Sequence, residues 1–141
     1  MKELGLAVGV NYITNSEWDE EVLRATAGHG VDHVIEVGGA GTLEKSFRVV
    51  RRGGTISLIG VLSGFEGTVD PLPVLLKGIR LQGASVGPRE VFEEMNRAIT
   101  QHAIRPVIDR VFPFEEAREA LHHLESGKHF GKIVVRVAEK N

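Results

Sequence analysis

The residues best placed to do chemistry in this 141-residue chain are three glycines, Gly38, Gly39 and Gly41, which follow an apolar run. Glycine tolerates positive φ and lets the backbone approach a ligand closely, and a glycine turn that opens a helix can cradle phosphates. The turn matches only part of the dinucleotide pattern G-x-G-x-x-G, because Glu44 stands where the third glycine belongs. We interpret it first as a tight strand-to-helix turn lining a crevice, and second as a direct pyrophosphate site.

The other reactive side chains form no recognisable centre. His122 and His123 are adjacent on a predicted helix and point about 100° apart, so they cannot both face one metal. Ser57 and Ser63 lack the G-x-S-x-G pattern of serine hydrolases. The chain has no cysteine, which excludes disulfides, thiolate catalysis and thiolate metal ligands. The sequence therefore predicts no catalytic residue and no metal ligand here.

Residues 31–61 predict the element that positions the glycine turn. Residues 31–37 and 55–61 are short apolar runs rich in β-formers. Between them Leu43, Phe47 and Val50 recur at helical spacing. This pattern predicts a βαβ unit with strands buried on both faces, and such units bind ligands beyond the carboxyl ends of their strands.

The rest of the chain predicts an alternation of helices and strands. The expected strands are Val8–Ile13, Ile79–Val86 and Ile133–Val137, with residues 104–112 extended. The expected helices are Ser16–Ala27, 71–77 ending at Gly78, one opening at Pro88 with Phe92, Met95 and Ile99 inward, and Phe114–Glu125. In the helix of the βαβ unit, Thr42 is the expected N-cap. Arg51 and Arg52 are expected in the last turn, where they suit the helix dipole, and Gly53-Gly54 is expected to end the helix.

Composition narrows the function classes. Hydrophobic residues make up 42% and charged residues 26% of the chain, as in ordinary globular proteins. A net charge of -2 gives no electrostatic footprint for nucleic acid or an anionic membrane. The N-terminus lacks a signal-peptide pattern, and no apolar run is long enough to span a membrane. We expect a cytoplasmic protein with neither nucleic-acid nor membrane partners.

Four segments together resemble one known family, the medium-chain dehydrogenases/reductases, which include zinc-type alcohol dehydrogenases and quinone reductases. The segments similar to the C-terminal half of that family are KELG at the start, GVDHVIEVGGAGTLEKSFRVVRRGGTISLIGV, IRLQGASVG and ESGKHFGKIVV. The resemblance implies an α/β fold, a partial Rossmann-like parallel sheet with flanking helices that lacks strands 1 and 2 of the cofactor domain. Residues 1–87 would be a partial dinucleotide-binding domain, and residues 88–141 a segment of the family's catalytic domain.

The resemblance also implies a cofactor, NAD or NADP, and residues that contact it. Zinc is possible in the family, but no ligand for it is expected in this chain. The implied cofactor-binding residues are Val37 and Gly38 on the ribose and diphosphate side, Ile59, Gly60 and Val61 beside the nicotinamide, and Ala84 and Val86 at its carboxamide. For Ile59 and Ala84, an ordinary buried strand end is an equally good interpretation.

The resemblance implies a truncated NAD(P)-dependent oxidoreductase of the alcohol dehydrogenase type, which in complete form transfers hydride between nicotinamide and an alcohol or carbonyl. We expect this chain alone to be inactive, because the phosphate loop and substrate domain would lie upstream. One alternative is a non-catalytic fragment that self-associates; a homodimer through Ile79–Val86 is expected in either case. A Rossmann-like methyltransferase fits less well, since its sheet normally ends in an antiparallel hairpin.

Overall fold

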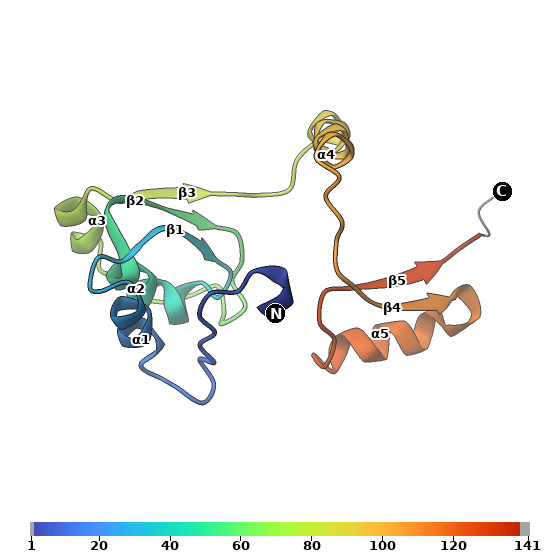
Figure 1. Cartoon of the computed structure of the whole chain (residues 1–141), viewed down its shortest axis with the longest axis horizontal. Coiled ribbons are helices and arrows are strands. Elements are labelled where there is room, and N and C mark those ends of the chain that lie inside the picture. The colour runs from blue at the N-terminus through green and yellow to red at the C-terminus, as the bar shows by residue number, and fades with distance from the viewer. Residues whose placement is uncertain (1, 139–141) are drawn as a thin grey trace. The chain divides into compact units, whose positions relative to one another are not determined.

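The computed structural model describes residues 2–138, and the chain divides into two compact units, Met1–Val86 and Gly87–Asn141 (Figure 1). Whether these units correspond to a cofactor domain and a piece of a catalytic domain stays a prediction. Among the described residues, no helix combines the length and apolar character needed to cross a membrane.

Helices and strands alternate through both units, as the sequence predicts. The first unit contains η1 (Lys2–Leu4), α1 (Trp18–Ala25), β1 (Val31–Glu36), α2 (Ala40–Val49), β2 (Val50–Leu58), α3 (Leu72–Lys77) and β3 (Arg80–Gly83). The second contains α4 (Arg89–Gln101), β4 (Ile108–Pro113), η2 (Phe114–Glu116), α5 (Ala117–Glu125) and β5 (Lys132–Arg136).

All strand pairings are parallel. The first unit has a three-stranded sheet in the order β1-β2-β3, in which Ile35 pairs with Ser57 and Ile56 with Leu81. The second unit has a two-stranded sheet of β4 and β5. Parallel strands joined by helices confirm the α/β class and the partial Rossmann-like sheet.

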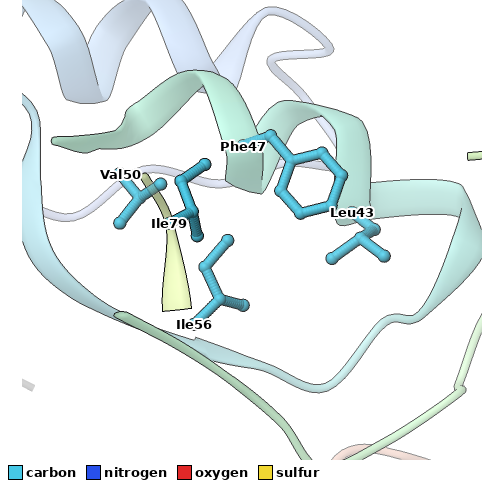
Figure 2. Packing of buried hydrophobic residues seen from close by; sticks show 5 residues of the cluster. All are labelled: Leu43, Phe47, Val50, Ile56 and Ile79. Carbon is cyan, nitrogen blue, oxygen red and sulfur yellow. The ribbon is translucent and has the colours of Figure 1, made fainter. Parts of the chain in front are cut away.

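The core of the first unit lies between α2 and the sheet. Its buried residues are Leu43, Phe47, Val50, Ile56 and Ile79, each at most 6% exposed (Figure 2). The opposite face of the sheet is exposed: Ile35 is 58% exposed there, and His33 Nε2 lies 2.8 Å from Ser57 Oγ. The expectation of strands buried on both faces is therefore wrong, since the helices of this unit cover one face (Figure 1).

Two further expectations fail where apolar residues lack a partner. Val8–Ile13 forms no strand, and its residues are mostly exposed. Phe92 and Met95 of α4 are 55% and 49% exposed. They do not face inward because α4 makes no extensive contact with β4, β5 or α5 within the described part of the second unit.

The transition from α2 to β2 also differs from expectation. The helix ends at Val49, ahead of Gly53-Gly54, so Arg51 and Arg52 lie in β2. The register passes from Val31–Val50 to His33–Thr55, which makes residues 51–54 a bulge opposite a single residue of β1. Lys77 Nζ donates to the carbonyls of Phe47, Arg48 and Val50 at 2.6–2.9 Å. This ammonium satisfies the carbonyls that the helix end leaves free, and ends α2 early.

Phe47→Ala tests whether this core holds the first unit together. Because Phe47 is 1% exposed, we expect its truncation to lower the free energy of unfolding by about 3–5 kcal/mol, measured by urea denaturation. Phe65→Ala is the matched control, since Phe65 is 90% exposed and should cost less than about 0.5 kcal/mol. Equal effects of the two substitutions would refute the core assignment.

Candidate functional site

The carboxyl ends of β1, β2 and β3 meet at one edge of the sheet, and every cofactor residue implied by the sequence follows one of these ends. The segments are Val37–Gly38 after β1, Ile59–Val61 after β2 and Ala84–Val86 after β3. We call these three segments the carboxyl edge. In open parallel sheets such an edge is where ligands bind.

Backbone hydrogen bonds hold the first two segments together. The amides of Ile59 and Gly60 donate to the Glu36 carbonyl at 2.8 and 3.2 Å, and the Leu62 amide donates to the Val37 carbonyl at 3.1 Å. The Ser63 hydroxyl donates to the Gly38 carbonyl at 2.7 Å. The ends of β1 and β2 are thus fixed relative to each other by main-chain contacts.

Gly60 must be glycine for this contact to form. A Cβ atom at this position would lie 2.6 Å from the Val37 carbonyl oxygen, which no real side chain tolerates. Gly39 is constrained in the same way: its φ is +87°, and a Cβ there would lie 2.9 Å from Val61 Cα. The glycines at this edge therefore serve close packing between the two segments.

The carboxyl edge divides into two hollows. Ile59, Ala84 and Val86 line one of about 720 Å³, and Val86 is 97% exposed. Val37 and Gly38 line a separate hollow of about 530 Å³, which Trp18 also lines. Gly60 and Val61, which follow Ile59, line neither of these two hollows. Of the nicotinamide-side candidates, the structure thus brings Ile59, Ala84 and Val86 together, and it sets the ribose-side candidates apart from them.

Sequence reasoning overlooked Glu36, which organises the β1–α2 turn. Its side chain is 3% exposed. One carboxylate oxygen accepts from the Gly38 amide at 2.7 Å, the Gly39 amide at 3.1 Å and Thr42 Oγ1 at 2.6 Å, and the other accepts from the Ser46 hydroxyl. The period of a strand could have revealed it, because Glu36 falls on the same face as the inward Val34, just before a helix N-terminus.

These donors set the charge of Glu36. Burial alone would raise its pKa, but hydrogen bonds from Ser46, Thr42 and the Gly39 and Gly38 amides outweigh burial and lower it. The carboxylate is therefore ionised at neutral pH. It also corrects one expectation: α2 begins at Ala40 with Gly39 as its N-cap residue, and the Thr42 hydroxyl serves Glu36 without capping the helix.

The Glu36 carboxylate occupies the place where a phosphate would bind at this turn. The Gly38 and Gly39 amides at the start of α2 already donate to it, and its negative charge repels another anion. We therefore reject the pyrophosphate interpretation of the glycine turn and keep the structural one.

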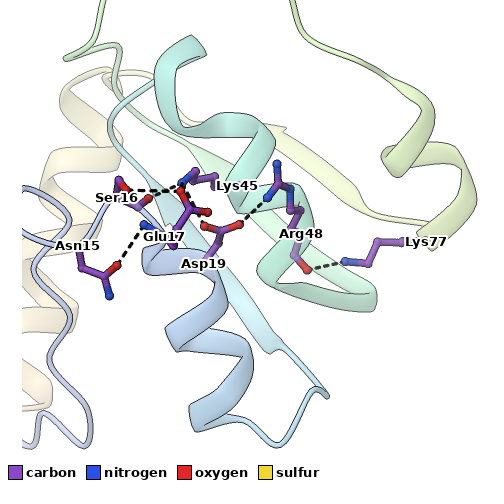
Figure 3. Close-up of polar contacts among 7 residues, drawn as sticks. All are labelled: Asn15, Ser16, Glu17, Asp19, Lys45, Arg48 and Lys77. Carbon is purple, nitrogen blue, oxygen red and sulfur yellow. Dashed lines mark hydrogen bonds and ion pairs between the residues drawn. The ribbon is translucent and has the colours of Figure 1, made fainter.

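A buried ion pair joins α1 to α2. Asp19, which is 1% exposed, lies 2.9 Å from Arg48 and 3.2 Å from Lys45, and Glu17 lies 3.6 Å from Lys45 (Figure 3). A buried carboxylate needs such partners, so this pair fixes α1 over α2. Because Trp18 is the neighbour of Asp19 in the sequence, the contacts of Asp19 also hold Trp18 at the hollow that Val37 lines.

Two histidines of the second unit, His122 and His123, have acidic partners. His123 Nε2 lies 2.8 Å from Asp109 Oδ2. The Phe130 amide donates to Asp109 Oδ1, and this bond, followed by that with His123, lowers the pKa of Asp109. His122 lies 3.7 Å from Glu125. Among residues 2–138, no group of three or more histidine or acidic side chains is arranged to hold a metal ion.

Comparison with known proteins gives a consistent result. A family model described as zinc-binding dehydrogenase matches residues 8–135. A zinc-type alcohol dehydrogenase-like protein of Schizosaccharomyces pombe is 36% identical over 141 residues, covering 96% of this chain and 40% of that protein. An NAD-dependent alcohol dehydrogenase of Sulfolobus acidocaldarius is 31% identical, with the same two coverages.

A solved structure agrees in fold. The crystal structure of an NAD-dependent alcohol dehydrogenase superposes with a TM-score of 0.81 at 33% identity, covering 97% of this chain and 40% of that one. The chain thus spans about 40% of the length of the relatives that it matches.

Glu36→Gln tests the role of the buried carboxylate. Because the folded-state pKa of Glu36 lies below its ordinary value, the ionised group stabilises the fold at neutral pH, and that contribution is lost as pH falls from the ordinary pKa through the lowered one. We expect the substitution to cost about 1.5–3 kcal/mol at pH 7, and the difference from wild type to shrink on acidification. Urea denaturation at several pH values between roughly 3 and 7, the range in which carboxylates titrate, measures the cost of the substitution and its change with pH.

Glu44→Gln provides the control, because Glu44 lies exposed on the same helix. It should leave both stability and its pH dependence close to wild type. A difference between wild type and Glu36→Gln that stays constant with pH would show that the Glu36 charge does not stabilise the turn.

Proposed function

The chain belongs to the zinc-binding dehydrogenase family, and from this premise we propose that its first unit forms one side of an NAD(P) site in an oxidoreductase of the alcohol dehydrogenase type. In the complete enzyme the reaction is hydride transfer between the nicotinamide and an alcohol or carbonyl. Family membership also leaves the methyltransferase alternative without support. We further propose a cytoplasmic location, which the absence of cysteine favours.

The observation that carries the proposal is the position of the seven candidate residues at one carboxyl edge. Ile59, Ala84 and Val86 line one hollow, which suits a flat nicotinamide ring. Backbone groups after β3 would meet its carboxamide, while Val37 and Gly38 would face the ribose and diphosphate. The cofactor supplies the hydride chemistry, and the role of these residues is to bind and orient the ring.

The described residues supply few contacts for the phosphates. The Gly38 and Gly39 amides at the start of α2 already donate to Glu36. We therefore propose that this chain alone binds NAD(P) with a dissociation constant above about 1 mM and does not catalyse hydride transfer. Since no metal-holding cluster occurs among residues 2–138, we assign no zinc ligand and derive no step through zinc.

Saturation-transfer NMR with millimolar NAD and NADP tests this proposal. We expect weak transfer to the nicotinamide protons, and Val86→Asp should reduce it about tenfold, since an exposed carboxylate there repels the diphosphate and disturbs the carboxamide contact. Val137→Asp is the control, because Val137 is also exposed but lies in the second unit. Equal loss in both variants, or micromolar binding by calorimetry, would contradict the proposal.

We also propose a homodimer in which Ile79–Val86 of two chains pair at the free edge of β3. The Ala84 amide donates to the Leu58 carbonyl on β2 at 2.9 Å. Since successive amides along a strand point to opposite sides, the Leu81 amide points away from β2, toward the free edge. An unpaired row of donors and acceptors of this kind is a template for a second strand.

Leu81→Pro removes one edge donor and leaves the donors to β2 in place. We expect it to give a monomer by sedimentation velocity. Leu81→Ala is the matched control, because it keeps the amide and should stay dimeric. A wild-type chain that sediments as a monomer at high concentration would rule out the dimer.

A further inference from the structure

A second hollow of the first unit lies at the end of α2 opposite to the carboxyl edge. It measures about 440 Å³, within the range of small-molecule pockets, and positively charged side chains line much of it. We call it the basic groove; its lining residues are Leu23, Gly28, His29, Arg48, Val50, Arg51, Arg52 and Lys77. About 15 Å of helix separates this end of α2 from its glycine turn.

The cations of the groove exceed the carboxylates that face them. Arg48 pairs with Asp19 and Arg51 with Asp32, at 2.9 and 2.5 Å. Asp19 is shared with Lys45, so it does not fully neutralise Arg48. Within residues 2–138, the recorded partners of Arg52 and Lys77 are carbonyl oxygens and no carboxylate. The groove therefore carries uncompensated positive charge.

Local geometry keeps these cations close together. The bulge at residues 51–54 places Arg51 and Arg52 next to each other, and the Arg52 guanidinium donates to the Leu76 carbonyl at 2.8 Å, beside Lys77. The pKa of Lys77 is lowered, first by burial and then by the charge of Arg52. The fold thus holds like charges close together, and a bound anion would reduce the repulsion between them.

We propose that the basic groove binds a small anion that carries a phosphate or pyrophosphate group. Arg52 is the main contact, since it uses one terminal nitrogen for Leu76, and a guanidinium offers several donors in a fork that matches phosphate oxygens. Arg48, which is exposed, extends the contact from α2. Lys77 stays on its three carbonyls and contributes charge. A concave hollow of about 440 Å³ suits a small molecule better than a flat protein surface.

Thermal unfolding with inorganic pyrophosphate at constant ionic strength tests the proposal. We expect pyrophosphate to raise the Tm of the wild-type chain, with sodium chloride as the matched salt. Arg52→Gln removes the guanidinium and keeps a polar side chain, and it should weaken the apparent affinity about tenfold. Arg24→Gln, an exposed arginine paired with Glu21 on α1, should behave as wild type.

Amide NMR shifts locate the binding. Shifts at Gly28, His29 and Arg51–Gly53 support the proposal, whereas shifts confined to Gly38–Gly41 overturn it. An equal response of the two variants, or a wild-type response no larger than that to sodium chloride, also overturns it. A parallel titration with phenyl phosphate identifies the source of the anion. Binding at least as tight as that of pyrophosphate indicates an organic phosphate ester, and weaker binding indicates a free inorganic anion.

Discussion

The Glu36 carboxylate is the interaction on which the rest of the first unit depends. It is ionised, almost fully buried, and satisfied by the amides of the β1–α2 turn and by two hydroxyls of α2. A buried charge with a full set of donors fixes the groups around it, because moving any of them leaves the charge unsatisfied. The direction of α2 and the end of β1 are set together, and the contacts between Gly60 and Val37 follow from them.

Side chains from outside α2 thus satisfy free backbone groups at both ends of the helix. The Glu36 carboxylate accepts hydrogen bonds at the N-terminus, where an anion could otherwise bind. The Lys77 ammonium donates hydrogen bonds to the carbonyls at the C-terminus. Each arrangement has a functional consequence. At the first end, a dinucleotide must find its phosphate donors away from the glycine turn. At the second, the partly buried Lys77 ammonium and the neighbouring Arg52 leave a positively charged hollow.

Periodicity and turn residues were enough to predict much of this fold. The βαβ unit followed from apolar spacing around Phe47 and Ile56, and α3 followed from the proline at its start and Gly78 at its end, where φ is +62°. Side-chain partners across the fold were not predictable. The period of β1 places Glu36 on the inward face, but it does not show which donors surround the carboxylate. Lys77 contacts carbonyls about thirty residues away in the sequence, as its spacing from Phe47 shows.

Burial was the least predictable property, since it depends on what packs against each face. The apolar residues of α4 were expected inward from spacing alone, which identifies a face but not its partner; in the structure Phe92 is largely exposed. The same holds at the carboxyl edge. The sequence predicts each of the three strands but extends it one to three residues too far, to Val37, Val61 and Val86, whereas the strands end at Glu36, Leu58 and Gly83. Only the structure divides the candidates into two hollows.

The central claim is that the edge formed by the three strand ends receives the nicotinamide cofactor. Mapping NADH-induced shifts of the backbone amides by NMR, at millimolar cofactor, tests it most directly. The account predicts shifts concentrated at Ile59–Val61 and Ala84–Val86, with the glycine turn at 39–41 little affected. Shifts concentrated at that turn, or in the second unit around Pro113 and Arg136, would contradict it.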